Sequence, residues 1–303
     1  MNSKRPALSS RFGHLCTFAV LLFFSSATVA AQTRVIMLGT GTPNAVPERS
    51  GPATAIVVGE SVYLVDCGPG IVRRAAAAGL KMPALKRVFL THLHHDHTSG
   101  LADLILSPWT LERTDPLDLY GPPGSAAMAK HILAAYKEDI RIRLDGLEPA
   151  NTTGYKVTPH DVKPGIIYKD ADVTVRAFAV PHGSWKYAYG YRFETRDNKV
   201  IVISGDTTKS DEIARQAAGA DILIHEAYSE AGLAKREPVW QKYHSSFHTS
   251  SRDLARIAAQ AKPKLLVLYH LVLSGQTPES VLAEVTEIYK GPVVVAKDLQ
   301  VFD

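Results

Sequence analysis

The feature that most constrains this chain is a run of histidines at residues 91–97, which reads Thr-His-Leu-His-His-Asp-His. The run follows an apolar segment typical of a buried strand and precedes the amphipathic pattern of a helix. Burying several unpaired polar side chains in a protein core is costly. Imidazole nitrogens and carboxylate oxygens are also the ligands that zinc accepts. The run therefore predicts a metal site at the end of a strand.

The spacing within this run favours two ions rather than one. His92 and His94 can point the same way from an extended segment, because side chains alternate along it. Asp96 and His97 lie past the turn and can reach a second ion close by. The alternative is a solvated, histidine-rich loop, which would not need this combination of zinc ligands.

Three more polar residues each come directly after an apolar strand. His182 follows the segment at 173–180, Asp206 follows 200–204, and His270 follows 265–268. Each of them alone could be a capping or surface residue. The ends of strands in layered folds converge on one rim, where binding sites are usually built. We therefore expect these three side chains to complete the ligand set.

The rest of the chain alternates short β-branched segments with Ala-rich helical ones. Strands are predicted at 34–38, 53–58, 62–65, 88–91, 117–120, 173–180, 187–194, 200–204, 222–224, 265–268 and 292–295, and helices at 71–78, 99–106, 125–140, 210–218, 250–261 and 278–290. Hairpin-like pairs mixed with helices predict sheets covered by helices. Asp197-Asn198 predicts a tight turn between two strands. No linker divides the chain, so we expect one domain over residues 32–303.

Residues 1–31 have the layout of a secretory signal peptide: a basic start, an apolar run at 15–24 and small residues at 25–31. The apolar run is about half of the ~20 residues that a membrane-spanning helix needs. We expect cleavage after Ala30 or Ala31, a periplasmic or secreted location, and no stable membrane association afterwards. The alternative is an uncleaved membrane anchor.

Removing this segment also changes the charge. It contains Lys4, Arg5 and Arg11 and no acidic residue, so the formal net charge falls from +4 to +1. A near-neutral chain argues against strong non-specific binding to nucleic acid, which depends on neutralising phosphates.

Taken together, these motifs resemble the metallo-β-lactamase superfamily, and within it the ribonuclease Z branch. The similarity runs from about residue 34 to residue 303. Besides the histidine run it includes the segments at 38–47, 64–70, 120–124, 204–207 and 225–228. The resemblance implies an α/β fold, a four-layer αββα sandwich, with a metal site at one edge of its two sheets.

The resemblance also implies the roles of the site residues. The ligands it assigns are His92, His94 and His182 for the first ion, and Asp96, His97 and His270 for the second, with Asp206 bridging. Two divalent ions are expected, with zinc favoured over manganese or iron. The resemblance makes His248 a proton donor and Glu226 the residue that orients it. His244 is a rival for the donor role, and His248 and Glu226 could instead be structural.

Two divalent ions held by two carboxylates and neutral imidazoles keep a positive charge, which favours an anionic or carbonyl substrate. Such ions lower the pKa of water from about 16 towards ~7. We therefore expect an exported hydrolase that cleaves phosphodiester bonds with hydroxide from the site, with Asp96 among the catalytic residues. Substrates would be a small anionic ester or a short RNA. Trp185 is a candidate for stacking on an aromatic group, although packing in the core or at the rim is the commoner role of such a residue. Alternatives are an arylsulfatase-like enzyme, a lactonase or β-lactamase, and a periplasmic metal-binding protein.

Ribonuclease Z enzymes commonly carry a long arm that grips transfer RNA. Here only a tight turn separates the strands predicted at 187–194 and 200–204, and residues 140–170 lack a Lys/Arg-rich arm pattern. With the predicted export, this makes physiological processing of transfer RNA unexpected. A homodimer is expected because relatives are often dimers.

Overall fold

The computed structural model describes residues 1–3, 7 and 32–303. Nearly all of the predicted signal peptide, including its apolar run, lies outside these residues, so the prediction stays untested. Residues 31–303 form one compact unit, and the fold below is that of this unit. Within the part of the chain that the structure describes, no helix combines the length and the apolar character needed to cross a membrane.

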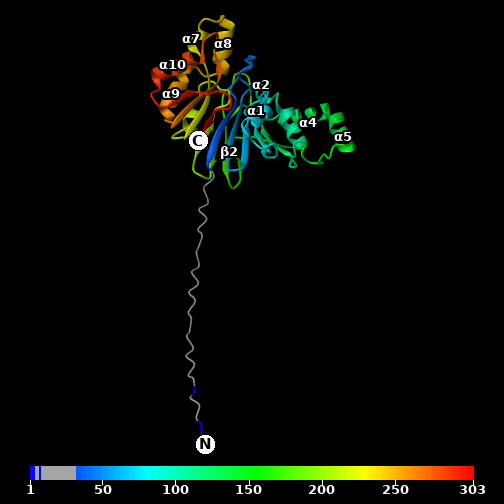
Figure 1. Ribbon diagram of the computed structural model, residues 1–303. Coiled ribbons are helices and arrows are strands. Elements are labelled where there is room, and N and C mark those ends of the chain that lie inside the picture. Colours follow the sequence, from blue (N-terminus) through cyan, green and yellow to red (C-terminus); the bar gives the residue numbers. More distant parts are fainter. Residues whose placement is uncertain (4–6, 8–31) are drawn as a thin grey trace. The chain divides into compact units, whose positions relative to one another are not determined.

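Two seven-stranded sheets form the centre of this unit (Figure 1). The first sheet has the order β14 (Val301–Phe302), β1 (Thr33–Gly39), β2 (Ala53–Val58), β3 (Ser61–Val65), β4 (Arg87–Phe89), β5 (Leu117–Gly121) and β6 (Val157–Asp161). The second has the order β13 (Val293–Val295), β12 (Leu265–Val272), β11 (Ile222–Tyr228), β10 (Val200–Ile203), β9 (Tyr189–Thr195), β8 (Val173–Ala179) and β7 (Gly165–Lys169).

Each sheet is antiparallel in one half and parallel in the other. In the first sheet β3, β4, β5 and β6 run parallel, and in the second β10, β11, β12 and β13 do. The carboxyl ends of parallel strands gather at one edge of a sheet, where open α/β sheets bind their ligands. This arrangement brings the segments after β4, β10 and within β12 to a common edge.

Helices cover the outer face of each sheet. The helices are α1 (Ile71–Ala77), η1 (Met82–Ala84), α2 (His95–Thr98), α3 (Leu101–Thr110), α4 (Ser125–Ala135), α5 (Lys137–Asp145), α6 (Asp211–Gln216), α7 (Glu230–Leu233), α8 (Pro238–Phe247), α9 (Ser251–Ala261) and α10 (Pro278–Ile288). Side chains of α1, α3 and α4 pack on the first sheet, and those of α6, α9 and α10 on the second. A third apolar layer, which includes Phe89, Tyr191 and Phe193, fills the space between the sheets. The predicted four-layer αββα sandwich is confirmed.

The hairpin between β9 and β10 also agrees with the sequence. Asn198 has a positive φ of 61°, which Asn tolerates better than most residues, and its N–H donates to the Thr195 carbonyl at 2.9 Å. The two strands pair antiparallel on either side of this turn. No arm is inserted between them.

The secondary structure differs from the prediction in several places, and the short elements η1, α2, β7, α7 and β14 were not predicted. The helix expected at 125–140 breaks at Tyr136, where α4 ends and α5 begins, and of α5 only Ile140 is buried. The strand β6 was missed because it carries Pro159 and no alternation of apolar residues, as sheet-edge strands do. The helix α8 was also missed, and none of its residues is buried, although it carries large apolar side chains.

Candidate metal centre and active-site cavity

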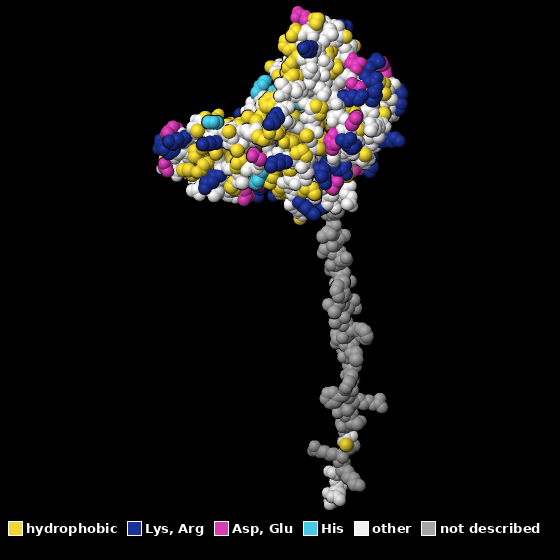
Figure 2. All heavy atoms as spheres, turned by 180° about the vertical axis from the view of Figure 1, so that it is seen from behind, with side chains coloured by type: hydrophobic (Ala, Val, Ile, Leu, Met, Phe, Trp, Pro, Cys, Tyr) yellow, Lys and Arg dark blue, Asp and Glu magenta, His cyan; other side chains and the backbone are white. Residues whose placement is uncertain are grey.

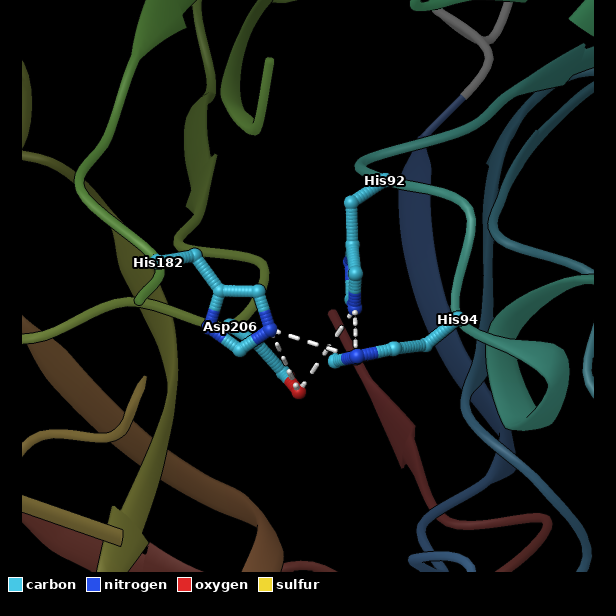
Figure 3. A group of neighbouring side chains, drawn as sticks. All are labelled: His92, His94, His182 and Asp206. Atoms are coloured by element: carbon cyan, nitrogen blue, oxygen red, sulfur yellow. Dashed lines mark hydrogen bonds and ion pairs between the residues drawn. The ribbon is translucent and has the colours of Figure 1, made fainter. Parts of the chain in front are cut away.

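The first group of predicted ligands meets at the edge of the two sheets (Figure 3). His92 and His94 lie between β4 and α2, and His182 follows β8. Nδ1 of His94 lies 2.9 Å from Nε2 of His92 and 3.2 Å from Nε2 of His182. Asp206, after β10, closes the group, with its Oδ2 at 3.9 Å from His92 Nε2 and 4.0 Å from His182 Nε2.

The second group lies directly beside the first and shares Asp206 with it. Asp96 and His97 come from α2, and His270 from β12. Asp96 Oδ2 is 3.2 Å from His270 Nε2 and 3.6 Å from His97 Nε2. Asp206 reaches the same two rings, at 3.4 Å from His97 Nε2 and 3.6 Å from His270 Nε2. The structure thus brings all seven predicted ligands together, with Asp206 between the groups.

Several groups outside the two ligand groups contact these side chains and orient them. The Asp66 carboxylate lies 2.8 Å from His97 Nδ1 and accepts from the N–H of Thr91 at 2.8 Å. His182 Nδ1 lies 2.7 Å from the Phe247 carbonyl. Such outer partners fix the tautomer and orientation of a metal-binding imidazole. Sequence reasoning assigned no role to Asp66, although it comes directly after the apolar strand β3.

Two of these positions have an unusual backbone. Asp66 and His270 have positive φ values of 60° and 46°, and neither is glycine. Non-glycine residues in this region cost about 1–3 kcal/mol each, and such conformations cluster at functional sites. The surrounding fold therefore holds both side chains in place at a cost to stability.

The electrostatics of the first group favour neutral imidazoles. Burial and the nearby His182 lower the pKa of His94 to about 4, and burial lowers the pKa of His182 to about 4. Burial and the neighbouring His97 hold the pKa of His92 well below its ordinary value. At neutral pH these three rings therefore offer lone pairs to a cation.

The carboxylates of the site are ionised. Burial opposes ionisation, but His270 and His97 hold the pKa of Asp206 well below its ordinary value, and the same two rings bring that of Asp96 to about 2. His97 Nε2 and Asp206 Oδ1 are buried without a hydrogen-bond partner. The ligand atoms within each group lie within 4.8 Å of one another. Convergent lone pairs, ionised carboxylates and unpartnered polar atoms suit divalent metal.

His248 and Glu226 also meet as predicted. His248 follows α8, and its Nδ1 lies 3.3 Å from Oε2 of Glu226 in β11. The other carboxylate oxygen of Glu226 accepts from the Thr249 N–H at 2.8 Å. Burial opposes protonation of the ring, but Glu226 raises the pKa of His248. Asp206, His248 and His270 also form a possible ligand group, so the geometry leaves a ligand role for His248 open.

A cavity of about 920 Å³ opens beside this site, and His94, Asp96, Asp206, His248 and His270 line it. The rival donor His244 lines it too.

The aromatic side chains of this cavity are not those that the sequence suggested. Trp185 does not line it, because its indole N–H contacts Nε2 of His94 at 2.8 Å, on the ring edge away from the other ligands. Trp185 thus packs against a predicted ligand, and the lining of this cavity gives no support to the stacking role. Its aromatic residues are Trp240 and Tyr243 of α8, which sequence reasoning missed along with the helix itself.

Comparison with known proteins agrees with this architecture. A family model described as the beta-lactamase superfamily domain matches residues 62–271. Ribonuclease Z from Mycobacterium bovis is 33% identical over 271 residues, which is 88% of this chain and 96% of that protein. The solved metallo-beta-lactamase fold protein YhfI from Bacillus subtilis superposes with a TM-score of 0.70 at 20% identity, covering 89% of this chain and 98% of that one. Human tRNase Z, short form, gives 0.66 at 22% identity, with coverages of 89% and 98%.

Proposed function

Because the chain belongs to the beta-lactamase superfamily, and within it to the ribonuclease Z-like branch, we propose that it is a dinuclear hydrolase that cleaves phosphodiester bonds. The observation that carries the proposal is the pair of ligand groups that share Asp206. His92, His94 and His182 would hold one ion, and Asp96, His97 and His270 the other.

The chemistry of the donors favours zinc, because imidazole and carboxylate are its common ligands, with manganese or iron as alternatives. When bound, such ions would lower the pKa of water towards ~7 and offset the charge that grows on the substrate oxygens. The imidazoles of the first group stay neutral at pH 7 and therefore do not offset the charge of a cation. Two bound divalent ions would leave the site with a net positive charge.

His248 supplies the proton in this proposal. Its Nδ1 faces Glu226, so Nε2 is the ring nitrogen that can donate to a leaving-group oxygen in the cavity. Glu226 favours the protonated ring and is itself fixed by the Thr249 N–H. A positioned acid of this kind contributes typically 10²–10⁴-fold to the rate, an order-of-magnitude range.

Small anionic esters or short RNA fit this site better than folded transfer RNA. The turn between β9 and β10 leaves no arm to grip a large RNA. On the face drawn in Figure 2, basic and acidic side chains are interspersed rather than gathered by sign. Binding the many phosphates of a large RNA depends on a surface where basic side chains are concentrated, and this face has none.

Export is part of the same proposal and rests on the three-part layout of residues 1–31. Fractionation of the native host, with Edman sequencing of the mature protein, tests it. A new N-terminus at Ala31 or Gln32 is expected, and full-length protein in the cytoplasm would contradict export alone.

The activity is tested with bis-p-nitrophenyl phosphate, p-nitrophenyl sulfate, a lactone and a chromogenic cephalosporin, each with and without chelator. Chelator-sensitive cleavage of the phosphodiester above the other substrates is expected. Sulfate cleavage tenfold or more above it, about 1.4 kcal/mol in the barrier, would favour the arylsulfatase-like alternative. No turnover of any substrate would favour a metal-binding protein.

Replacing His248 by Ala separates its two possible roles. We expect kcat to fall by about 100-fold or more while bound metal is unchanged. His131→Ala, an exposed position of α4, is the matched control and should leave both values unaltered. If His248→Ala loses metal in step with activity, His248 is a ligand and the donor role is wrong.

A further inference from the structure

The helix α8 presents its large apolar side chains outward. Val239, Trp240 and Tyr243 are 67%, 44% and 40% exposed, and no residue of α8 is buried. A helix of a globular protein usually buries its apolar stripe against the core. These three side chains are therefore not buried in the core of the described part of the chain.

The exposed aromatic rings of α8 lie in the wall of the cavity beside the candidate metal site. Trp240 and Tyr243 line the cavity of about 920 Å³ next to the ligands. The Tyr243 ring stacks on Phe247, with centroids 4.5 Å apart and planes at 27°. Phe247 in turn lies edge-on to the ligand ring of His182 at 5.1 Å. A row of aromatic rings thus leads from the ligands along one wall of the cavity.

The inner end of this wall is fixed by the site itself. The Phe247 carbonyl contacts Nδ1 of His182 at 2.7 Å, and the Gly183 N–H donates to the Ser246 carbonyl at 3.0 Å. The Phe247 ring lies so close to Gly183 that a Cβ there would meet it at 2.2 Å. The wall is therefore held in one position relative to the ligands, which reduces the ordering cost of binding a flat group on it.

The charges around the cavity favour an anion. Arg49 and Arg236 line it, and the Arg236 guanidinium lies 5.8 Å from the Trp240 ring centroid. Among the described residues, Asp96 and Asp206 of the predicted ligand groups are the only acidic residues in its lining. A substrate with an aromatic ring and a negative charge would therefore meet complementary groups on both counts.

We propose, building on the phosphodiesterase function above, that Trp240 and Tyr243 form a subsite for the aromatic group of an aryl phosphodiester anion. In its hydrolysis the oxygen of one water bonds to phosphorus and the bond from phosphorus to the aryl oxygen breaks. The electron pair stays on the aryl oxygen, which takes the proton of His248. The products are a phosphomonoester and a phenol. One proton of the water stays on the new hydroxyl group of the phosphomonoester, and the other returns His248 to its starting state.

Binding of two non-hydrolysable probes to the metal-loaded enzyme tests the subsite apart from catalysis. Phenylphosphonate and methylphosphonate share the anionic group and differ in the ring. We expect phenylphosphonate to bind the unaltered protein about tenfold more tightly, the size of a favourable aromatic contact with its buried area. In Trp240→Ala the ratio of the affinities for phenylphosphonate and methylphosphonate should fall to about twofold or less. In Trp240→Phe most of this preference should remain.

Val239→Ala is the matched control, since Val239 is the neighbouring exposed residue on α8 and does not line the cavity. It should keep the ratio of the unaltered protein. Equal binding of both probes to the unaltered protein, or an unchanged ratio in Trp240→Ala, would overturn the subsite. Chelator-sensitive cleavage of bis-p-nitrophenyl phosphate, measured on the same samples, tests the proposed function separately. A protein that cleaves the diester without preferring the phenyl probe refutes the subsite alone.

Discussion

Asp66 shows how a side chain outside the predicted ligand groups can orient one of their members. Its carboxylate contacts His97 Nδ1 at 2.8 Å and is buried, so it fixes which nitrogen of that ring faces the ligand group. We expect Asp66→Asn to lower metal affinity by about 10–100-fold, the usual effect of losing such a partner. Titration with a competing chelator measures it.

The chain offers a matched control for this substitution. Asp118 and His160 form a second Asp–His pair at 3.1 Å, on β5 and β6, and neither residue belongs to the ligand groups. Asp118→Asn should leave the affinity within about twofold of the original, as surface pairs contribute little. Equal losses in both variants would mean that Asp66 acts through general stability.

The seven predicted ligands could be identified because each either belongs to the histidine run or lies at or near the carboxyl end of an apolar strand. Asp66 obeys the same rule, but one sequence does not reveal that its partner would be His97, 31 positions away. The aromatic residues of the cavity were harder to predict from the sequence. Trp185 lies near His182 in sequence, whereas Trp240 reaches the cavity only through the path of α8, and no local pattern encodes that path.

At the level of elements, the contact between α8 and the loop after β8 joins the cavity wall to a ligand. Gly183 has a φ of +51°, and its missing side chain makes room for the Phe247 ring. Gly183→Ala should displace Phe247 and with it the carbonyl that contacts His182. We expect kcat/KM for the diester to fall at least tenfold, measured by initial rates on metal-loaded protein.

Gly219→Ala isolates the backbone contribution, because Gly219 has a similar φ of +65° and open space around it. It should carry the left-handed strain, about 1–2 kcal/mol, without a change in kcat/KM. If both variants lose activity equally, strain rather than the Phe247 contact explains the loss.

The contact of α10 with the first residues of α7 and α9 depends on one carboxylate. Glu284 of α10 accepts hydrogen bonds at the starts of α7 and α9, from the hydroxyls of Ser229 and Ser251 and the N–H groups of Glu230 and Ala231. Burial opposes its ionisation, but these donors hold the pKa of Glu284 below its ordinary value. Glu284→Gln should lower the free energy of unfolding by about 2 kcal/mol at pH 7.

The pH dependence of this loss follows from the direction of the shift. A lowered pKa in the folded state gives stability that is present above the unfolded value, about 4.3, and is lost as the pH falls. Denaturant unfolding should therefore show the two proteins converging below about pH 4. Glu287→Gln, an exposed residue of the same helix, should change stability by less than about 0.5 kcal/mol. A gap that persists at low pH would contradict the assignment.

At the scale of the whole molecule, sheets covered by helices were predictable because the strands and most of the helices carry clear periodic patterns. The four-layer arrangement was implied by the resemblance to the superfamily. The structure has three apolar layers, one between the two sheets and one on the outer face of each. The order of the strands could not be predicted from the sequence, because it depends on pairings such as β1 with β14, which join residues more than 260 positions apart. The expected homodimer stays a prediction.

The most direct test of the account is the metal content of the purified protein after loading with zinc or manganese and removal of free ions. Elemental analysis should return about two equivalents per chain, because such sites take up metal as part of the folded structure. Asp206→Ala, which removes the residue shared by both groups, should reduce this number sharply. Less than about one equivalent in the unaltered protein would contradict the two-ion centre and the hydrolytic mechanism built on it.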